Sequence, residues 1–125
     1  MIKKLAALVN KRIIGHAWEQ EACTYLIKQG LQVETQNYRT QRGEIDLIMR
    51  DNNTLVFVEV RYRQQSRYGG AIESITFAKR QRIISAAQHY LQKNALSEKI
   101  KCRFDVICWQ SSTTISWIKD AFQVE

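Results

Sequence analysis

Apolar residues recur at helical spacing in two segments of the chain, and the first of them covers residues 16–29. Its apolar side chains follow one another at i, i+4, i+7 and i+8, so that they share one helix face: Trp18, Ala22, Tyr25 and Leu26. Gly30 stands where a glycine commonly ends a helix. Glu19 borders the apolar stripe, so we expect its carboxylate to lie beside the protein body instead of pointing away from it.

The second helix is predicted to begin after Thr76, which is suited to be its N-cap, and to end at about Gln92. Its apolar residues again share one face: Ile83, Ile84, Ala87, Tyr90 and Leu91.

Strand patterns fill the region between these helices and the segment after the second one. Residues 54–63 give the strongest strand signal, because β-branched and aromatic residues dominate there. Asp51-Asn52-Asn53 before them is typical of a turn, and the polar residues 64–75 after them are predicted to form a loop. The predicted strands are residues 31–40, 44–50, 54–63, 101–109 and, as a short last strand, 114–118.

The predicted order of elements is αβββαβ within one domain of residues 1–125, in which residues 1–14 form a basic N-terminal segment. A strand, a helix and a strand in succession indicate a right-handed parallel crossover, whereas the hairpin before it is antiparallel. We therefore predict an α/β fold with a mixed sheet and with helices packed on that sheet.

Two carboxylates interrupt strands that are otherwise apolar. The run Leu55 to Val58 is typical of a strand that is covered on both faces, and Glu59 directly follows it. Asp46 lies in an equally apolar strand. If Asn52-Asn53 is a two-residue hairpin loop, Asp46 faces Glu59 with their Cβ atoms about 5 Å apart.

Facing carboxylates repel each other, and a bound cation would reverse that effect. Mg²⁺ typically takes one or two carboxylates plus a substrate phosphate, and the bound ion can polarise the phosphate and activate a water. The same register makes Glu44 face Arg61. Two alternatives stay open: Arg61 and Arg63 neutralise the acidic pair as ion-pair partners, or a register shift of one residue separates the two carboxylates.

The chain carries a formal net charge of +7 and has a pI of about 9.5, which favours polyanionic partners such as nucleic acid. No stretch approaches the ~20 apolar residues of a membrane span, and the run Leu5 to Val9 is too short for the core of a signal peptide. Three cysteines without a CxxC pair fit a reducing compartment. We therefore expect a cytoplasmic protein without a membrane segment.

Basic and aromatic residues follow directly after the acidic pair. Arginine binds phosphate bidentately, and tyrosine can stack on an unpaired base. A solvated basic surface is the plainer interpretation of the same residues. The predicted nucleic-acid-binding residues are Arg61, Arg63, Arg67, Tyr68 and Lys79.

Several short motifs occur in a fixed order between Gly15 and Val106. They are Gly15-x-x-x-Glu19-x-x-Ala22, Asn37-Tyr38-Arg39, Gly43-Glu44-Ile45-Asp46-Leu47-Ile48, Val56-Phe57-Val58-Glu59-Val60, Tyr68-Gly69, Lys79 and Arg103-Phe104-Asp105-Val106. Each motif is short, but the ordered set is specific. In this order the motifs resemble the YraN-like family of small bacterial proteins.

That family is similar in fold to the restriction-endonuclease-like nucleases, which include archaeal Holliday-junction resolvases and use a helix Glu, a strand Asp and a Glu-x-Lys motif. The resemblance implies Glu19, Asp46 and Glu59 as the catalytic set that binds Mg²⁺ or Mn²⁺. The lysine position of the motif falls on Arg61. Arginine stays protonated and offers a fork to phosphate, so phosphate binding is preserved. If Arg61 limits catalysis, Arg61→Lys is expected to raise cleavage.

Three functions are compatible with these residues. The first is a Mg²⁺-dependent nuclease for branched or single-stranded DNA, with Asp46 and Glu59 on the metal, Glu19 completing its shell and Arg61 on the scissile phosphate. The second is an inactive module that binds DNA or RNA. The third is a basic protein that docks an acidic partner. A symmetric junction cutter would need two active sites and therefore a homodimer.

Overall fold

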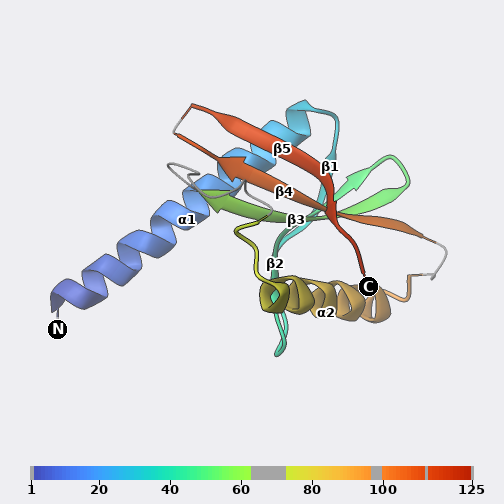
Figure 1. Cartoon of the computed structure of the whole chain (residues 1–125), viewed down its shortest axis with the longest axis horizontal. Helices are drawn as coiled ribbons and strands as arrows, with labels where there is room; N and C mark the ends of the chain where they lie inside the picture. The colour runs from blue at the N-terminus through green and yellow to red at the C-terminus, as the bar shows by residue number, and fades with distance from the viewer. Residues whose placement is uncertain (1, 63–72, 97–99, 112, 125) are drawn as a thin grey trace.

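The computed structural model describes the backbone of residues 2–62, 73–96, 100–111 and 113–124, and their side chains from residue 15 onward. Five strands form one sheet, in which each strand lies beside its neighbour in the chain (Figure 1). The elements are α1 (Ile2–Lys28), β1 (Gln32–Arg39), β2 (Glu44–Asp51), β3 (Thr54–Tyr62), α2 (Phe77–Lys93), β4 (Lys101–Trp109) and β5 (Ile115–Phe122).

The sheet is mixed. Strands β3 and β4 are parallel and are joined through α2, whereas the pairs β1–β2, β2–β3 and β4–β5 are antiparallel. The predicted crossover and the predicted α/β fold with a mixed sheet are therefore confirmed, and the arrangement is consistent with a restriction-endonuclease-like fold. No helix in the described part of the chain has the length and apolar character that a membrane crossing needs.

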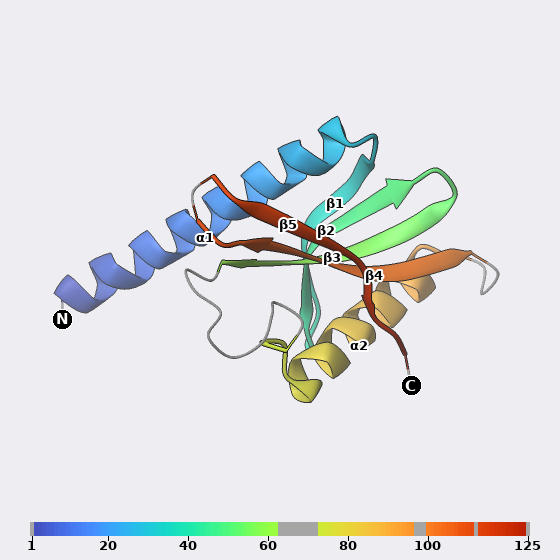
Figure 2. The same cartoon turned by 45° about the horizontal axis from the view of Figure 1, so that its top comes forward.

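The two helices cover opposite faces of the sheet (Figure 2). Strand β3 supplies both cores, because its side chains alternate between the faces. Leu55 and Phe57 pack with α2, and Val56 and Val58 pack with α1. The continuous apolar run was predicted to be covered on both sides, and this is confirmed.

The helix signals next to the site also hold. Gly30 has φ 101° and directly follows the last turn of α1, as a glycine at a helix end commonly does. Thr76 is the N-cap of α2, and its Oγ1 accepts the backbone N–H of Lys79 at 3.1 Å. This cap fixes the first turn of α2, which carries Lys79 toward the sheet.

Two element boundaries were predicted wrongly. Helix α1 begins at Ile2 instead of residue 16. Residues 2–14 are rich in Leu, Ala and Lys, which favour helices, and one Gly15 costs only about 1 kcal/mol relative to alanine. Strand β5 extends to Phe122 instead of ending at residue 118. Asp120 has φ 51° and interrupts the alternation of its last residues, so the pattern did not reveal them.

Candidate acidic site where strands β2 and β3 separate

Strands β2 and β3 pair in the predicted register from Asp51 and Thr54 as far as Leu47 and Val58. Asn52 in the turn has φ 54°, as tight hairpin turns require. Beyond Leu47, the Val60 N–H donates to the side-chain Oδ2 of Asp46 at 2.8 Å. In a continued ladder this N–H would instead donate to a backbone carbonyl of β2. The first residues of β2 turn away from β3 at this point (Figure 1). The strands thus separate at the predicted acidic pair.

This separation overturns one expectation. Glu44 was predicted to face Arg61 across β2 and β3, but it pairs with β1, where it lies opposite Arg39. Arg39 Nε lies 3.4 Å from Glu44 Oε2. The prediction failed because it extended a regular register past Leu47 and Val58, where the paired ladder ends, and the predicted register pair of Asp46 with Glu59 also lies beyond that end.

Glu59 is 6% exposed and faces two cations. Its Oε1 lies 3.6 Å from Arg61 Nη1 and 3.8 Å from Lys79 Nζ. The Arg61 guanidinium is also held by the Ser74 carbonyl, to which Nη2 donates at 3.3 Å. Arg61 therefore pairs with Glu59, as the ion-pair alternative proposed, while Arg63 lies outside the described residues. Lys79, predicted only as a phosphate ligand, also contacts the acidic pair.

Glu19 approaches Asp46 from α1. When Glu19 is protonated it hydrogen-bonds the Asp46 carboxylate, and the Asn37 side chain also hydrogen-bonds Glu19. An open pocket of about 540 Å³ leads to this group and is lined by Gly15, His16, Glu19, Asn37, Arg39 and Glu44. The structure thus brings together the three carboxylates that the resemblance implied, from α1, β2 and β3.

The negative charge of Asp46 disfavours the charged forms of Glu19 and Glu59. Burial, and then the negative charge of Asp46, raise the pKa of Glu59 to about 8. Burial and the same Asp46 charge raise the pKa of Glu19 to about 7. Burial also raises the pKa of Asp46, although the Val60 N–H and the Lys79 ammonium oppose that rise. Near neutral pH the group therefore retains protons that isolated carboxyl groups would have lost.

The donor chemistry suits a hard cation, because Mg²⁺ and Mn²⁺ prefer carboxylate oxygens. No three His, Cys, Asp or Glu side chains among the described residues are gathered into a ready metal site. Mg²⁺ commonly takes only one or two carboxylates and completes its shell with water and phosphate, so Asp46 and Glu59 suffice as protein ligands. The residues present therefore fit such an ion, which would replace the protons and cations that now neutralise them.

Two contributors were not assigned by sequence reasoning. Asn37 was noticed only within a family motif, yet its side chain reaches Glu19, and its φ of 53° marks a left-handed position that asparagine tolerates well. Gly43 was noticed in the same way and packs against the backbone of α2. The predicted phosphate ligands Arg67 and Tyr68 lie outside the described residues.

The chain forms a mixed α/β fold with an acidic group where two strands separate, an arrangement consistent with a restriction-endonuclease-like fold. The model of the uncharacterised protein family UPF0102 matches residues 18–109, and the chain belongs to this family. A UPF0102 protein of Nitrosococcus oceani is 51% identical over 114 residues, which are 89% of this chain and 92% of the relative. A relative from Coxiella burnetii is 49% identical over 112 residues, with 90% and 93% covered. One from Aeromonas hydrophila is 50% identical over 109 residues, with 86% and 83% covered.

Proposed function

We propose that this protein is a metal-dependent, nuclease-like enzyme that binds nucleic-acid phosphate at the acidic site and cleaves branched or single-stranded DNA. The observation that carries the proposal is the meeting of Glu19, Asp46 and Glu59 where β2 and β3 separate. Burying like charges costs free energy, and folds retain such groups where a ligand offsets the cost.

Each residue has a distinct role in the proposal. Asp46 and Glu59 hold Mg²⁺ or Mn²⁺, and Glu19 completes the acidic set through its contact with Asp46. The bound ion supplies Lewis acidity toward the phosphate and lowers the pKa of a water. Arg61, held by Ser74, presents its guanidinium to a phosphate oxygen.

Lys79 gives the proposal a lysine that the strand motif lacks. Its Nζ lies 3.8 Å from Glu59 Oε1, and it reaches this position from α2 instead of from β3. Unlike arginine, a lysine ammonium can be shifted in pKa and can help to orient a water. Arg61 at the usual lysine position therefore does not by itself rule out catalysis.

A second candidate is a nucleic-acid-binding module without cleavage activity. The two cations on Glu59 favour it, because they neutralise the carboxylate without any metal. The two candidates share phosphate binding and differ in turnover.

A cleavage screen with Mg²⁺ and Mn²⁺ over duplex, flap, junction and single-stranded DNA separates them. We expect cleavage of a branched or single-stranded substrate by the wild type and its loss in Asp46→Asn and Glu59→Gln. Glu21→Gln is the matched control, because Glu21 is an exposed carboxylate on α1. Salt-dependent binding without cleavage would favour the inactive module. If the protein neither binds nor cleaves DNA, the result would favour the third function, a basic protein that docks an acidic partner.

A further inference from the structure

The turn between β1 and β2 is closed by hydrogen bonds among its own residues. Thr40 N–H donates to the Gly43 carbonyl at 2.8 Å, and Thr40 Oγ1 accepts the backbone N–H groups of Arg42 at 3.2 Å and Gly43 at 3.1 Å. The turn residue Arg42 is thus fixed through its own backbone, which lowers the entropy lost when its side chain binds a ligand.

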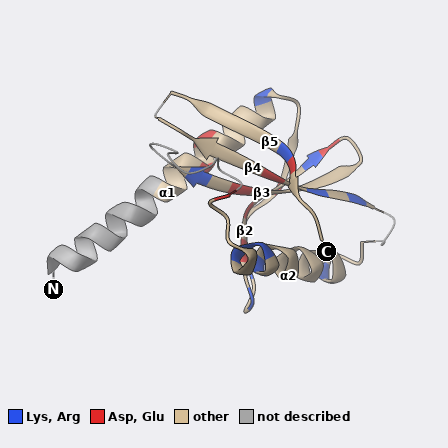
Figure 3. Cartoon of the chain, viewed as in Figure 1, with Lys and Arg blue, Asp and Glu red and all other residues tan. Residues whose placement is uncertain are grey.

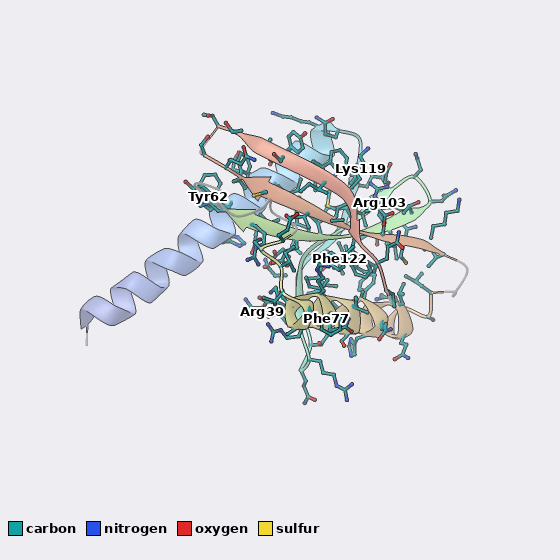
Figure 4. The ribbon with its side chains drawn as sticks, in the orientation of Figure 1. Arg39, Tyr62, Phe77, Arg103, Lys119 and Phe122 are labelled. Carbon is teal, nitrogen blue, oxygen red and sulfur yellow. The ribbon has the colours of Figure 1, made fainter. Side chains whose placement is uncertain are left out.

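This turn is packed tightly against α2. A Cβ added at Gly43 would lie 2.2 Å from the Arg82 carbonyl oxygen, which is a steric clash. Only glycine, which has no Cβ, fits this position without a shift of the backbone. The close approach places the arginines of the turn beside the basic face of α2. Figure 3 shows Lys and Arg residues both at the start of α2 and on the turn below it, and Figure 4 shows Arg39 at the same end of α2.

An open pocket of about 340 Å³ lies between the turn and the helix, and its lining is strongly basic. It contains four cationic side chains and one carboxylate: Arg39, Arg42, Lys79, Arg82 and Glu44. Glu44 pairs with Arg39 at 3.4 Å, but both side chains are largely exposed, so this pair is weak. Among the described residues, no carboxylate lies within ion-pair distance of Arg42 or Arg82.

The pocket adjoins the acidic site through a shared residue. Lys79 lines the pocket and also lies 3.8 Å from Glu59 Oε1. A polyanionic strand with one phosphate at the acidic site would therefore meet further cations directly beyond Lys79. Arginine forks match phosphate oxygens bidentately, and contacts of this kind carry no base specificity.

We infer that this turn–helix pocket binds the sugar-phosphate backbone of nucleic acid next to the phosphate held at the acidic site, with Arg42 and Arg82 as its principal ligands. The inference rests on the proposed function and adds the path of the bound nucleic acid. Its backbone would run from the acidic site, past Lys79, toward the β1–β2 turn. Binding there depends on phosphate and not on base sequence.

Fluorescence anisotropy of labelled oligothymidine and of a duplex, measured in EDTA across a salt series, tests the inference. The variant Arg42→Gln/Arg82→Gln changes two exposed side chains. We expect it to flatten the slope of log affinity against log salt by about 1.4 on the single strand and about 1.8 on the duplex, because each phosphate contact contributes roughly 0.7 and 0.9. The control Lys28→Gln/Lys93→Gln removes the same charge from exposed residues outside the pocket and should retain a near wild-type slope.

The outcomes separate the two proposals. Wild-type binding that both double variants weaken equally overturns the pocket as a binding site and leaves the proposed function intact. Salt-dependent wild-type binding that is lost selectively in Arg42→Gln/Arg82→Gln supports it. No salt-dependent binding by the wild type would overturn the proposed function, and the pocket would fall with it.

Discussion

The sheet holds two buried acidic groups that are satisfied in opposite ways. Asp105 on β4 is fully buried, and its oxygens accept from Arg103 Nε at 3.0 and 3.2 Å, from Trp117 Nε1 at 2.9 Å and from Asp120 N–H at 3.0 Å. At the acidic site, Glu19 and Glu59 each interact with Asp46, and burial and the Asp46 charge raise the pKa values of both glutamates.

The two acidic groups differ in how their charge is balanced within the fold. Donors from three residues surround Asp105, so its charge stabilises the fold. Burial opposes the charges of Asp46 and Glu59, and among the described residues their partners are the Val60 N–H, protonated Glu19 and two cations at the margin of ion-pair distance. Acids that disfavour one another in the free protein are suited to bind a cation that reverses their repulsion.

The largest effect is expected at Asp105. Asp105→Asn should lower the free energy of unfolding by about 3 kcal/mol, because Arg103 keeps only its ion pair with Asp51 and an amide NH2 donor is turned toward other N–H donors. Urea denaturation measures it. Asp120→Asn is the matched control, because asparagine tolerates the φ of 51° there. An Asp105→Asn variant as stable as this control would remove the distinction between the two acidic groups.

The next largest effect concerns Lys79. Lys79→Met should lower Mg²⁺-dependent cleavage about 100-fold, equivalent to about 2.7 kcal/mol of transition-state stabilisation. Lys93→Met, on the exposed surface of the same helix, should retain activity. Because Lys79 already lies beside Glu59, we now expect Arg61→Lys to change the rate little instead of raising it. A large gain in Arg61→Lys together with an active Lys79→Met would assign the lysine role to the strand position.

Stability without metal should depend on pH in a direction that the pKa of Glu59 sets. This pKa is raised from 4.5 to about 8, so the folded chain holds a proton that the unfolded chain has released between these values. The group's contribution to stability is therefore present below about pH 4.5 and is lost as the pH rises to about 8.

Glu59→Gln isolates this effect, because glutamine resembles the protonated acid. The variant should match the wild type at pH 5 and exceed it at pH 8.5 by roughly 1–3 kcal/mol. Thermal unfolding in EDTA over this pH range measures the difference, with Glu21→Gln as the exposed control. A constant difference from the wild type at all pH values would contradict the raised pKa of Glu59.

The smallest effect is expected at Gly43. Gly43→Ala keeps every charge but forces the β1–β2 turn away from the Arg82 carbonyl. Oligonucleotide affinity should fall roughly fivefold, equivalent to about 1 kcal/mol. Anisotropy measures it, and the circular dichroism spectrum serves as the check on folding. Unchanged affinity would show that the turn binds no phosphate.

The fold was largely predictable, because local patterns fix its elements. The helix faces, the Asn52-Asn53 loop and the β2–β3 register follow from periodicity and turn chemistry. Extending that register predicted that Asp46 lies near Glu59, and the two residues do interact, although the paired ladder ends at Leu47 and Val58. The mistaken pairing of Glu44 shows the limit of that reasoning. Nothing local reveals that Asp46 captures the Val60 N–H and ends the ladder.

The rest of the site depends on contacts between distant elements. Glu19 meets Asp46 only because α1 packs on the face that Val56 and Val58 present, and the family resemblance alone indicated their partnership. Lys79 reaches Glu59 because of where α2 lies on the opposite face. Periodicity predicts which face of a helix is buried, but not its position along the sheet.

Mn²⁺ binding, followed by electron paramagnetic resonance with a phosphorothioate oligonucleotide present at pH 8, tests the acidic site as a metal site most directly. We expect bound Mn²⁺ in the wild type and in Glu21→Gln, and its loss in Asp46→Asn and Glu59→Gln. Asp105→Ala is unsuitable as a control because it should destabilise the fold. Equal Mn²⁺ binding by wild type and Asp46→Asn, or no binding by the folded wild type, would contradict the central claim.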